Sequence, residues 1–170
     1  MLGFLFRALT ASPARGAALF DGVAREARRP SWYVDAGVPD TLDGRFAVLA
    51  TITALALVRL EQLGDEGEAL SVALAERFIE VMETEHRELG LGDPTLGKTV
   101  RKLVGSLSRR TDLARATVGG DDDWRDFACQ ALYKSDPDPA SVEAAAAALE
   151  QTWTRLARSD AATLAEGRIE

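Results

Sequence analysis

The sequence predicts an all-α protein, a single-domain bundle of about six to seven helices with no sheet. Apolar residues recur at helical spacing along most of the chain, and no segment shows the alternation of apolar and polar residues that marks a half-buried strand. The length of 170 residues suits one hydrophobic core. Apolar residues make up 46% and charged residues 28% of the chain, which are values typical of a globular protein rather than a disordered or fibrous one.

The first helix is predicted to begin at Pro13, because Ser12 is a suitable N-cap and proline fits the first helical position. The residues before it are unusually apolar for a chain terminus. Residues 1–30 therefore form a predicted N-terminal helical segment that packs on the core or contacts a partner. A later helix follows the turn at Pro39, and its residues 48–58 are apolar almost all round. This helix is predicted to be the buried centre of the bundle.

Turn and capping residues set the limits of the remaining helices. Gly64 suits the left-handed position that ends a helix, while Asp93 and Asp138 precede prolines that fit a first helical position. Four further helices are predicted, over residues 68–89, 94–119 and 124–132 and from Pro139 onward. In the first of them Glu76, Glu80 and Glu83 point outward. The second is strongly basic, and its Leu103, Val104 and Leu107 point inward. Residues 31–160 form the main helical domain, and residues 161–170 form a tail that is predicted to fray.

Charge and cysteine content exclude several classes of protein. The net charge of −7 argues against a nucleic-acid binder, because phosphate contacts need a basic face, so no DNA partner is expected. Cys129 is the single cysteine, which excludes an internal disulfide and a multi-cysteine zinc site. No run of about 18 apolar residues predicts a membrane-spanning helix, and the N-terminus lacks the basic start of a secretory signal. These features suit the bacterial cytoplasm.

Residues 92–99, Gly-Asp-Pro-Thr-Leu-Gly-Lys-Thr, match the phosphate-loop pattern GxxxxGK[ST] in full. In such a loop Lys98 would reach the β and γ phosphates of a nucleotide, and Thr99 would hold Mg²⁺. The context argues against this function, since a charged helix end stands where a strand is expected and Pro94 removes one N–H donor. A nucleotide-binding protein is kept as an alternative, but a turn between two helices is the simpler interpretation.

Other reactive side chains lack the partners that catalysis or metal binding requires. His86 is the only histidine and has no G-x-S-x-G elbow, and Cys129 stands beside apolar residues typical of a core. The three aspartates at residues 121–123 are better explained as a helix cap than as a cation site, because their spacing is not that of an EF-hand. We therefore expect no catalytic residue, metal site or cofactor, and no enzymatic activity.

Residues 33–46, Tyr-Val-Asp-Ala-Gly-Val-Pro-Asp-Thr-Leu-Asp-Gly-Arg-Phe, carry more glycine and polar detail than a simple connector needs. Gly37 suits a positive φ, Pro39 restricts the residue before it, and either Asp40 or Thr41 suits the N-cap of the next helix. From Gly37 onward this segment resembles the ubiquinol-cytochrome c chaperone family, whose members are assembly factors for cytochrome b of the bc1 complex.

A second block of the sequence resembles the same family: Arg87-Glu-Leu-Gly-Leu-Gly-Asp93, followed by Gly97 and Lys98. The resemblance implies a helical chaperone without catalytic residues that holds newly made cytochrome b while haem is acquired. Its place would be the cytoplasmic side of a bacterial inner membrane, or the matrix side in mitochondria. No cofactor of its own is expected, and a contact with haem through the client stays open. A general helical adaptor for a soluble partner is the remaining alternative.

Carried over by position, the resemblance implies two client-binding patches. The glycines and prolines in them are explained equally well by the turns that they form. Further partners that stay open are a ribosome or an anionic membrane surface, near the basic side chains that follow Lys98, and a small helper subunit. The first patch comprises Tyr33, Gly37, Val38, Pro39, Asp40, Asp43, Gly44, Arg45 and Phe46, and the second comprises Arg87, Gly90, Gly92, Asp93 and Lys98.

Overall fold

The computed structural model describes residues 13–88 and 93–170. Within these residues the chain forms eight helices and no strand, which confirms the all-α prediction. Two short helices, α3 (Ser31–Val34) and α9 (Ala161–Ala165), were not predicted. The six longer helices are α2 (Pro13–Ala27), α4 (Leu42–Gln62), α5 (Asp65–Glu88), α6 (Asp93–Gly119), α7 (Trp124–Leu132) and α8 (Pro139–Arg158).

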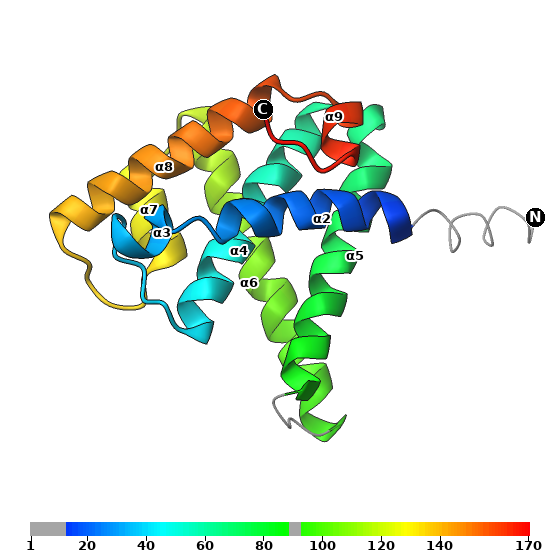
Figure 1. The fold of residues 1–170 in the computed structure, drawn as a ribbon, viewed down its shortest axis with the longest axis horizontal. Helices are drawn as coiled ribbons and strands as arrows, with labels where there is room; N and C mark the ends of the chain where they lie inside the picture. Colours follow the sequence, from blue (N-terminus) through cyan, green and yellow to red (C-terminus); the bar gives the residue numbers. More distant parts are fainter. Residues whose placement is uncertain (1–12, 89–92) are drawn as a thin grey trace, which may run out of the picture.

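Helix α4 is the centre of the bundle, as its apolar sequence predicts. Helices α2, α5, α6, α7 and α8 all pack against it (Figure 1). Ile52 and Leu55 have no exposed surface. The buried hydroxyls of Thr51 and Thr53 are satisfied within the helix, because each donates to the backbone carbonyl four residues earlier, at 2.7 and 2.8 Å. No helix in the described part of the chain combines the length and the apolar character that crossing a bilayer requires.

The other helices form two groups around α4 (Figure 1). Helices α5 and α6 run side by side and extend together beyond the rest of the bundle. Helices α7 and α8 pack against each other on the opposite side, next to α3. Helix α2 crosses this arrangement and contacts both α4 and α5. Segments distant in sequence therefore meet where α2 and α3 lie next to the start of α4.

The ends of the helices follow the predicted signals. Thr41, Asp123 and Asp138 are the N-caps of α4, α7 and α8, and their side-chain oxygens accept backbone N–H bonds at 2.8 to 3.2 Å. Gly64 and Gly120 follow α4 and α6 with φ of 59° and 87°, in the left-handed region that glycine occupies most readily. Local sequence thus determines most of the helix limits.

The C-terminal residues contradict the prediction of a frayed tail at 161–170. They include α9, whose Leu164 is fully buried. The guanidinium of Arg25 in α2 donates to the backbone carbonyl of Gly167 at 2.8 Å. The tail therefore packs on α2, because one buried leucine and a long-range hydrogen bond outweigh its polar composition.

Candidate functional site

A groove of about 1000 Å³ lies next to the turn that precedes α4, and we call it the motif groove. Its lining comes from α2, α3, α4, α5 and α6 and from the segments beside α3. The apolar residues that line it include Phe20, Ala24, Val34, Leu42, Phe46, Leu49, Val81 and Leu103. The polar residues that line it are Arg28, Tyr33, Asp40, Asp43, Arg45, Glu85 and Glu88. Five residues of the first predicted patch are thus brought together: Tyr33, Asp40, Asp43, Arg45 and Phe46.

Helix α3 positions Tyr33 at this groove. The indole N–H of Trp32, which is 1% exposed, donates to the carbonyl of Glu26 at 3.0 Å. The hydroxyl of Tyr33 donates to the carbonyl of Ala27 at 2.9 Å. These two bonds fix α3 to the last turn of α2. Burial raises the pKa of Tyr33, so its hydroxyl stays neutral at physiological pH.

The carboxylate of Glu26 is nearly buried and joins α2 to α8. Its residue is 5% exposed, and its oxygens accept bonds from Arg155 at 2.5 and 3.0 Å and from Thr152 at 3.3 Å. Arg29 adds an ion pair at 3.0 Å. A buried carboxylate is tolerated only with such partners, because an unpaired charge in the interior is costly. This network holds the end of α2 in the position from which α3 continues.

Side chains at the start of α4 give the motif groove a charged edge. Arg45 Nε donates to Asp40 Oδ1 at 2.6 Å, and both side chains are more than half exposed. The hydrogen bond from Arg45 lowers the pKa of Asp40, so the pair stays ionised at neutral pH. Asp43 pairs with Lys134 Nζ at 2.6 Å. The exposed carboxylates and guanidinium are therefore available to polar groups of a ligand.

Phe46 supplies an aromatic surface next to that charged edge. Its ring centroid lies 6.0 Å from that of Phe78, and the Cζ of Arg110 lies 5.8 Å from the Phe46 centroid. Arg110 also donates to the carbonyl of Ala131 at 2.8 and 3.1 Å. Burial lowers the pKa of Arg110, whose guanidinium remains charged at neutral pH. Phe46 is thereby held between α5 and α6.

Four residues of the first predicted patch shape the turn and do not line the groove: Gly37, Val38, Pro39 and Gly44. Val38 is 1% exposed. A Cβ added at Gly44 would lie 1.9 Å from the carbonyl oxygen of Pro39, which no real structure permits. Gly37 has φ of 61°, and its Cβ would lie 2.5 Å from Ser141 Oγ. The backbone requires these two glycines whatever the groove binds.

The second predicted patch is only partly described. Lys98 is exposed on α6 and lies outside the motif groove. Asp93 is the first residue of α6, and Arg87 belongs to the last turn of α5. Gly90 and Gly92 lie outside the described residues, as do the side chains of Arg87 and Asp93.

The start of α6 contradicts the phosphate-loop alternative. A phosphate loop wraps its backbone around the phosphates before its helix begins. Here the helix begins at Asp93, so Gly97, Lys98 and Thr99 lie in its second turn. The described residues contain no strand that could precede such a loop. They also contain no group of three or more His, Cys, Asp or Glu side chains placed to hold a metal ion.

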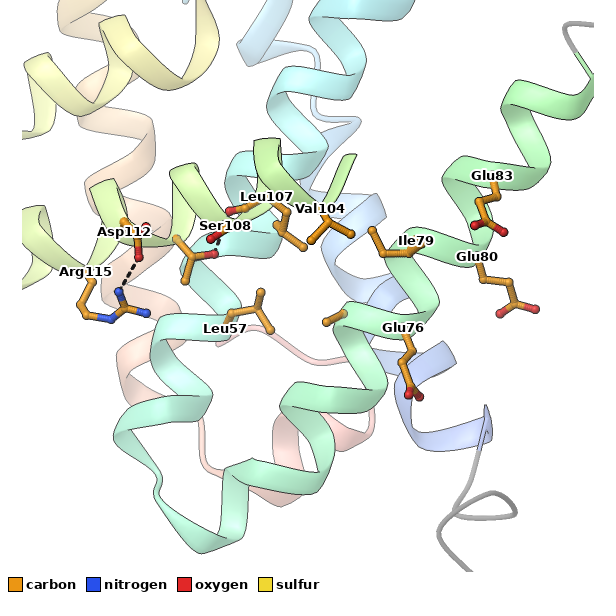
Figure 2. A pocket seen from close by; sticks show the side chains of 12 residues that line it. Leu57, Glu76, Ile79, Glu80, Glu83, Val104, Leu107, Ser108, Asp112 and Arg115 are labelled. Atoms are coloured by element: carbon orange, nitrogen blue, oxygen red, sulfur yellow. Dashed lines mark hydrogen bonds and ion pairs between the residues drawn. The ribbon is translucent and has the colours of Figure 1, made fainter. Parts of the chain in front are cut away.

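A second groove, of about 580 Å³, lies between α5 and α6 (Figure 2), and we call it the acidic groove. Sequence reasoning missed it, because Val104 was predicted to face inward but is 48% exposed. The one available signal is Ile79, which interrupts the charged outer face of α5. The apolar lining residues are Leu57, Ala75, Ile79, Val104 and Leu107, and the acidic ones are Glu76, Glu80, Glu83 and Asp112.

The described residues form an α-helical bundle with one hydrophobic core, and both the motif groove and the acidic groove combine apolar and charged residues. The family model described as ubiquinol-cytochrome C chaperone matches residues 34–170, and the chain belongs to this family. The crystal structure of the Cbp3 homolog from Brucella abortus is similar, with a TM-score of 0.78 and 25% sequence identity over 100% of this chain and 96% of that chain. A comparison with curated proteins gave no match. The family resemblance that begins at Gly37 is confirmed, and both findings support a role as an assembly chaperone of the bc1 complex.

Proposed function

We propose that the protein is a non-enzymatic chaperone that binds newly synthesised cytochrome b in the motif groove while the bc1 complex is assembled. The observation that carries this proposal is that five residues of the first predicted patch meet apolar side chains of α2, α5 and α6 around about 1000 Å³ of open space. Grooves of this size and character hold one face of a helix or a short extended segment.

The chemistry of the groove suits a client that is mostly transmembrane helix. Before insertion such helices expose apolar side chains that need cover. Val34 and Leu42 both line the motif groove and are 77% and 58% exposed, so they offer apolar surface that a client helix can cover. Arg45 and Asp40 at its edge offer hydrogen bonds to the polar ends of client helices. The groove thus offers apolar surface to the apolar segments of a client and hydrogen-bonding groups to the ends of its helices.

The surface near the start of α6 is proposed as a second contact. Lys98, Arg101 and Lys102 are exposed there, and Arg87, Gly90, Gly92 and Asp93 of the predicted second patch lie next to them in sequence. Such a basic surface fits anionic lipid at the inner face of a bacterial inner membrane, or at the matrix side in mitochondria, and it also fits ribosomal RNA. A small helper subunit remains a further proposed partner.

Photo-crosslinking during translation of cytochrome b tests the client and the groove together. A crosslinking residue at Leu42 should capture cytochrome b, whereas one at Val72, which is 54% exposed and lines neither groove, should not. In cells, Leu42→Asp should lower the cytochrome b haem signal and the amount of assembled bc1 complex, and Val72→Asp should leave both unchanged. Capture of soluble proteins alone from Leu42 would contradict the proposal and favour a general adaptor.

A further inference from the structure

We propose that the acidic groove is a separate docking site for an amphipathic helix of a partner protein whose polar flanks carry Lys or Arg. The groove and the motif groove share no lining residue. They also use different positions of α5, since Ile79 and Glu83 line the acidic groove whereas Val81, Met82 and Glu85 line the motif groove. The two sites can therefore be occupied and tested independently.

The apolar part of the acidic groove comes from three helices. In Figure 2, Leu57 of α4, Ile79 of α5 and Leu107 and Val104 of α6 border the same space. Leu57 and Leu107 are 8% and 6% exposed and form its base, while Val104 stands at its edge. The hydroxyl of Thr111, which also lines the groove, already donates to the carbonyl of Leu107 at 3.0 Å. The base of the groove is therefore an apolar surface, which apolar side chains of a partner can cover.

The rim of the groove is acidic along its α5 side. On α5, Glu76, Glu80 and Glu83 follow one another at helical spacing, and Asp112 stands on α6. Glu80 accepts a bond from Arg77 at 2.9 Å.

The cation that lines the groove, Arg115, is already held by carboxylates on both sides. It donates to Asp112 at 2.8 Å and to both oxygens of Glu61 at 2.9 and 3.0 Å. Its hydrogen bonds to Glu61 and Asp112 raise its pKa, so it stays charged and bound to them. The basic residues Lys98 and Arg101 on the same helix do not line the groove. The lining of the groove therefore holds four carboxylates and one guanidinium, and this excess of negative charge favours a cationic partner.

The dimensions fit a short helix. The acidic rim from Glu76 to Glu83 spans about 10 Å of α5, and the opposite wall from Val104 to Arg115 spans about 16 Å of α6, at about 1.5 Å per residue. This corresponds to about two to three helical turns. A partner helix would place apolar side chains at i, i+4 and i+7 along the base, and its basic residues on either side would meet the rim.

Other classes of occupant fit less well. Anionic lipid and nucleic acid would be repelled by the carboxylates of the rim. A second copy of this chain would bring a further net charge of −7. A transmembrane helix of the proposed client is apolar all round and would leave the rim carboxylates without partners. An amphipathic helix with basic flanks satisfies both parts of the groove.

Three designed peptides of equal length test the proposal with the full chain by fluorescence anisotropy. One carries leucine at i, i+4 and i+7 with lysine flanks, the second has glutamate in place of lysine, and the third is a scrambled form of the first. We expect the lysine peptide to bind at least about tenfold more tightly than either of the others, a difference of about 1.4 kcal/mol. If the scrambled peptide bound as tightly as the lysine peptide, net charge alone would explain the binding and the proposal would be overturned.

Variants locate the binding on the protein. Glu76→Lys combined with Glu83→Lys should reverse the preference, so that the glutamate peptide binds more tightly than the lysine peptide. Glu68→Lys combined with Glu150→Lys makes the same change of charge at exposed positions outside the groove and should keep the original preference. An unchanged preference in the first pair would overturn the proposal.

A third pair of variants separates this site from the motif groove. Val104→Ser should weaken binding of the lysine peptide by about tenfold, and Leu42→Asp should leave it unchanged. If Leu42→Asp alone abolished binding of the lysine peptide, the peptide would bind in the motif groove and the proposal would be overturned. The result does not depend on the identity of the client, because no cytochrome b is present in these measurements.

Discussion

The two grooves of this protein are built in different ways. The motif groove is assembled from segments distant in sequence, and what holds it together lies behind its surface: the carboxylate of Glu26 bound by Arg155, and the backbone of Gly44 against Pro39. The acidic groove is formed mainly by facing sides of two neighbouring helices, α5 and α6. Its polar side chains are exposed and pair along the surface.

This difference separates residues that identify the family from residues that meet a ligand. Gly37, Pro39 and Gly44 make the motif recognisable, yet none of them lines a groove. Asp40, Asp43 and Arg45 do line one, because the two glycines and the proline fix the turn that places them. We therefore expect substitutions behind the motif groove to change stability, and substitutions in the acidic groove to change binding alone.

The largest effect is expected for Glu26→Ala. It removes a carboxylate that is 5% exposed and leaves Arg155, whose side chain is 25% exposed, without its partner. We expect the free energy of unfolding to fall by about 3–5 kcal/mol in urea denaturation. Glu76→Ala at the rim of the acidic groove is the control, and should change it by less than about 0.5 kcal/mol. A loss below about 1 kcal/mol for Glu26→Ala would mean that the buried network does not support the motif groove.

The next largest effect is expected for Gly44→Ala. The added Cβ would lie 1.9 Å from the carbonyl oxygen of Pro39, so the turn must move away from the start of α4, and the cap bond that the residue 44 N–H donates to Thr41 Oγ1 is weakened. We expect a loss of about 2–3 kcal/mol from these two causes, measured by thermal or urea unfolding. Gly105→Ala is the matched control, because a Cβ there meets nothing within 4 Å and should stabilise α6 by about 0.5–1 kcal/mol. If the two variants changed the free energy of unfolding equally, the close contact of Gly44 with Pro39 would not stabilise the turn behind the motif groove.

A smaller effect, which depends on pH, is expected at Tyr133. Its hydroxyl donates to the carbonyl of Ala36, behind the motif segment, and burial raises its pKa from 10.0 to about 12. Because the folded-state pKa lies above the unfolded one, this contribution to stability is complete below pH 10 and is lost as the pH rises towards 12. We expect a loss of about 1 kcal/mol over that range, since the side chain is only partly buried.

Tyr133→Phe provides the control for the pH dependence. It should cost about 1 kcal/mol at neutral pH, because the hydrogen bond to Ala36 is lost. Between pH 10 and 12 the unfolding free energy of this variant should fall less steeply than that of the unchanged protein. Parallel curves would show that other groups, such as lysines, account for the loss.

The sequence was sufficient where local chemistry decides the outcome. The apolar run at 48–58 predicted the buried α4. The three aspartates at 121–123, of which Asp123 is the cap, predicted the start of α7, and Asp138 predicted the start of α8. The family resemblance that begins at Gly37 is also confirmed. By contrast, α3 and α9 have four and five residues, which is too short for helical periodicity to show.

The grooves could not be predicted because they arise from contacts between distant residues. Glu26 and Arg155 are 129 positions apart, and no local pattern indicates that they meet. In the acidic groove, Glu76, Glu80 and Glu83 were predicted only to point outward from α5. Only the packing of α5 against α6, with Leu57 of α4 between them, makes that face the rim of a cavity. Whether a charged helix face lines a groove is decided by the helices that pack beside it.

The smallest effect on stability is expected in the acidic groove itself. Val104 is 48% exposed, so Val104→Ser loses little burial and should change the free energy of unfolding by less than about 0.5 kcal/mol. Leu42→Ser in the motif groove, at 58% exposure, should behave in the same way. Because the two residues line separate grooves, the double variant should show the sum of the single changes within about 0.5 kcal/mol in urea denaturation. Coupling larger than this would mean that the two grooves respond to each other through α4 and α5, and that neither site acts alone.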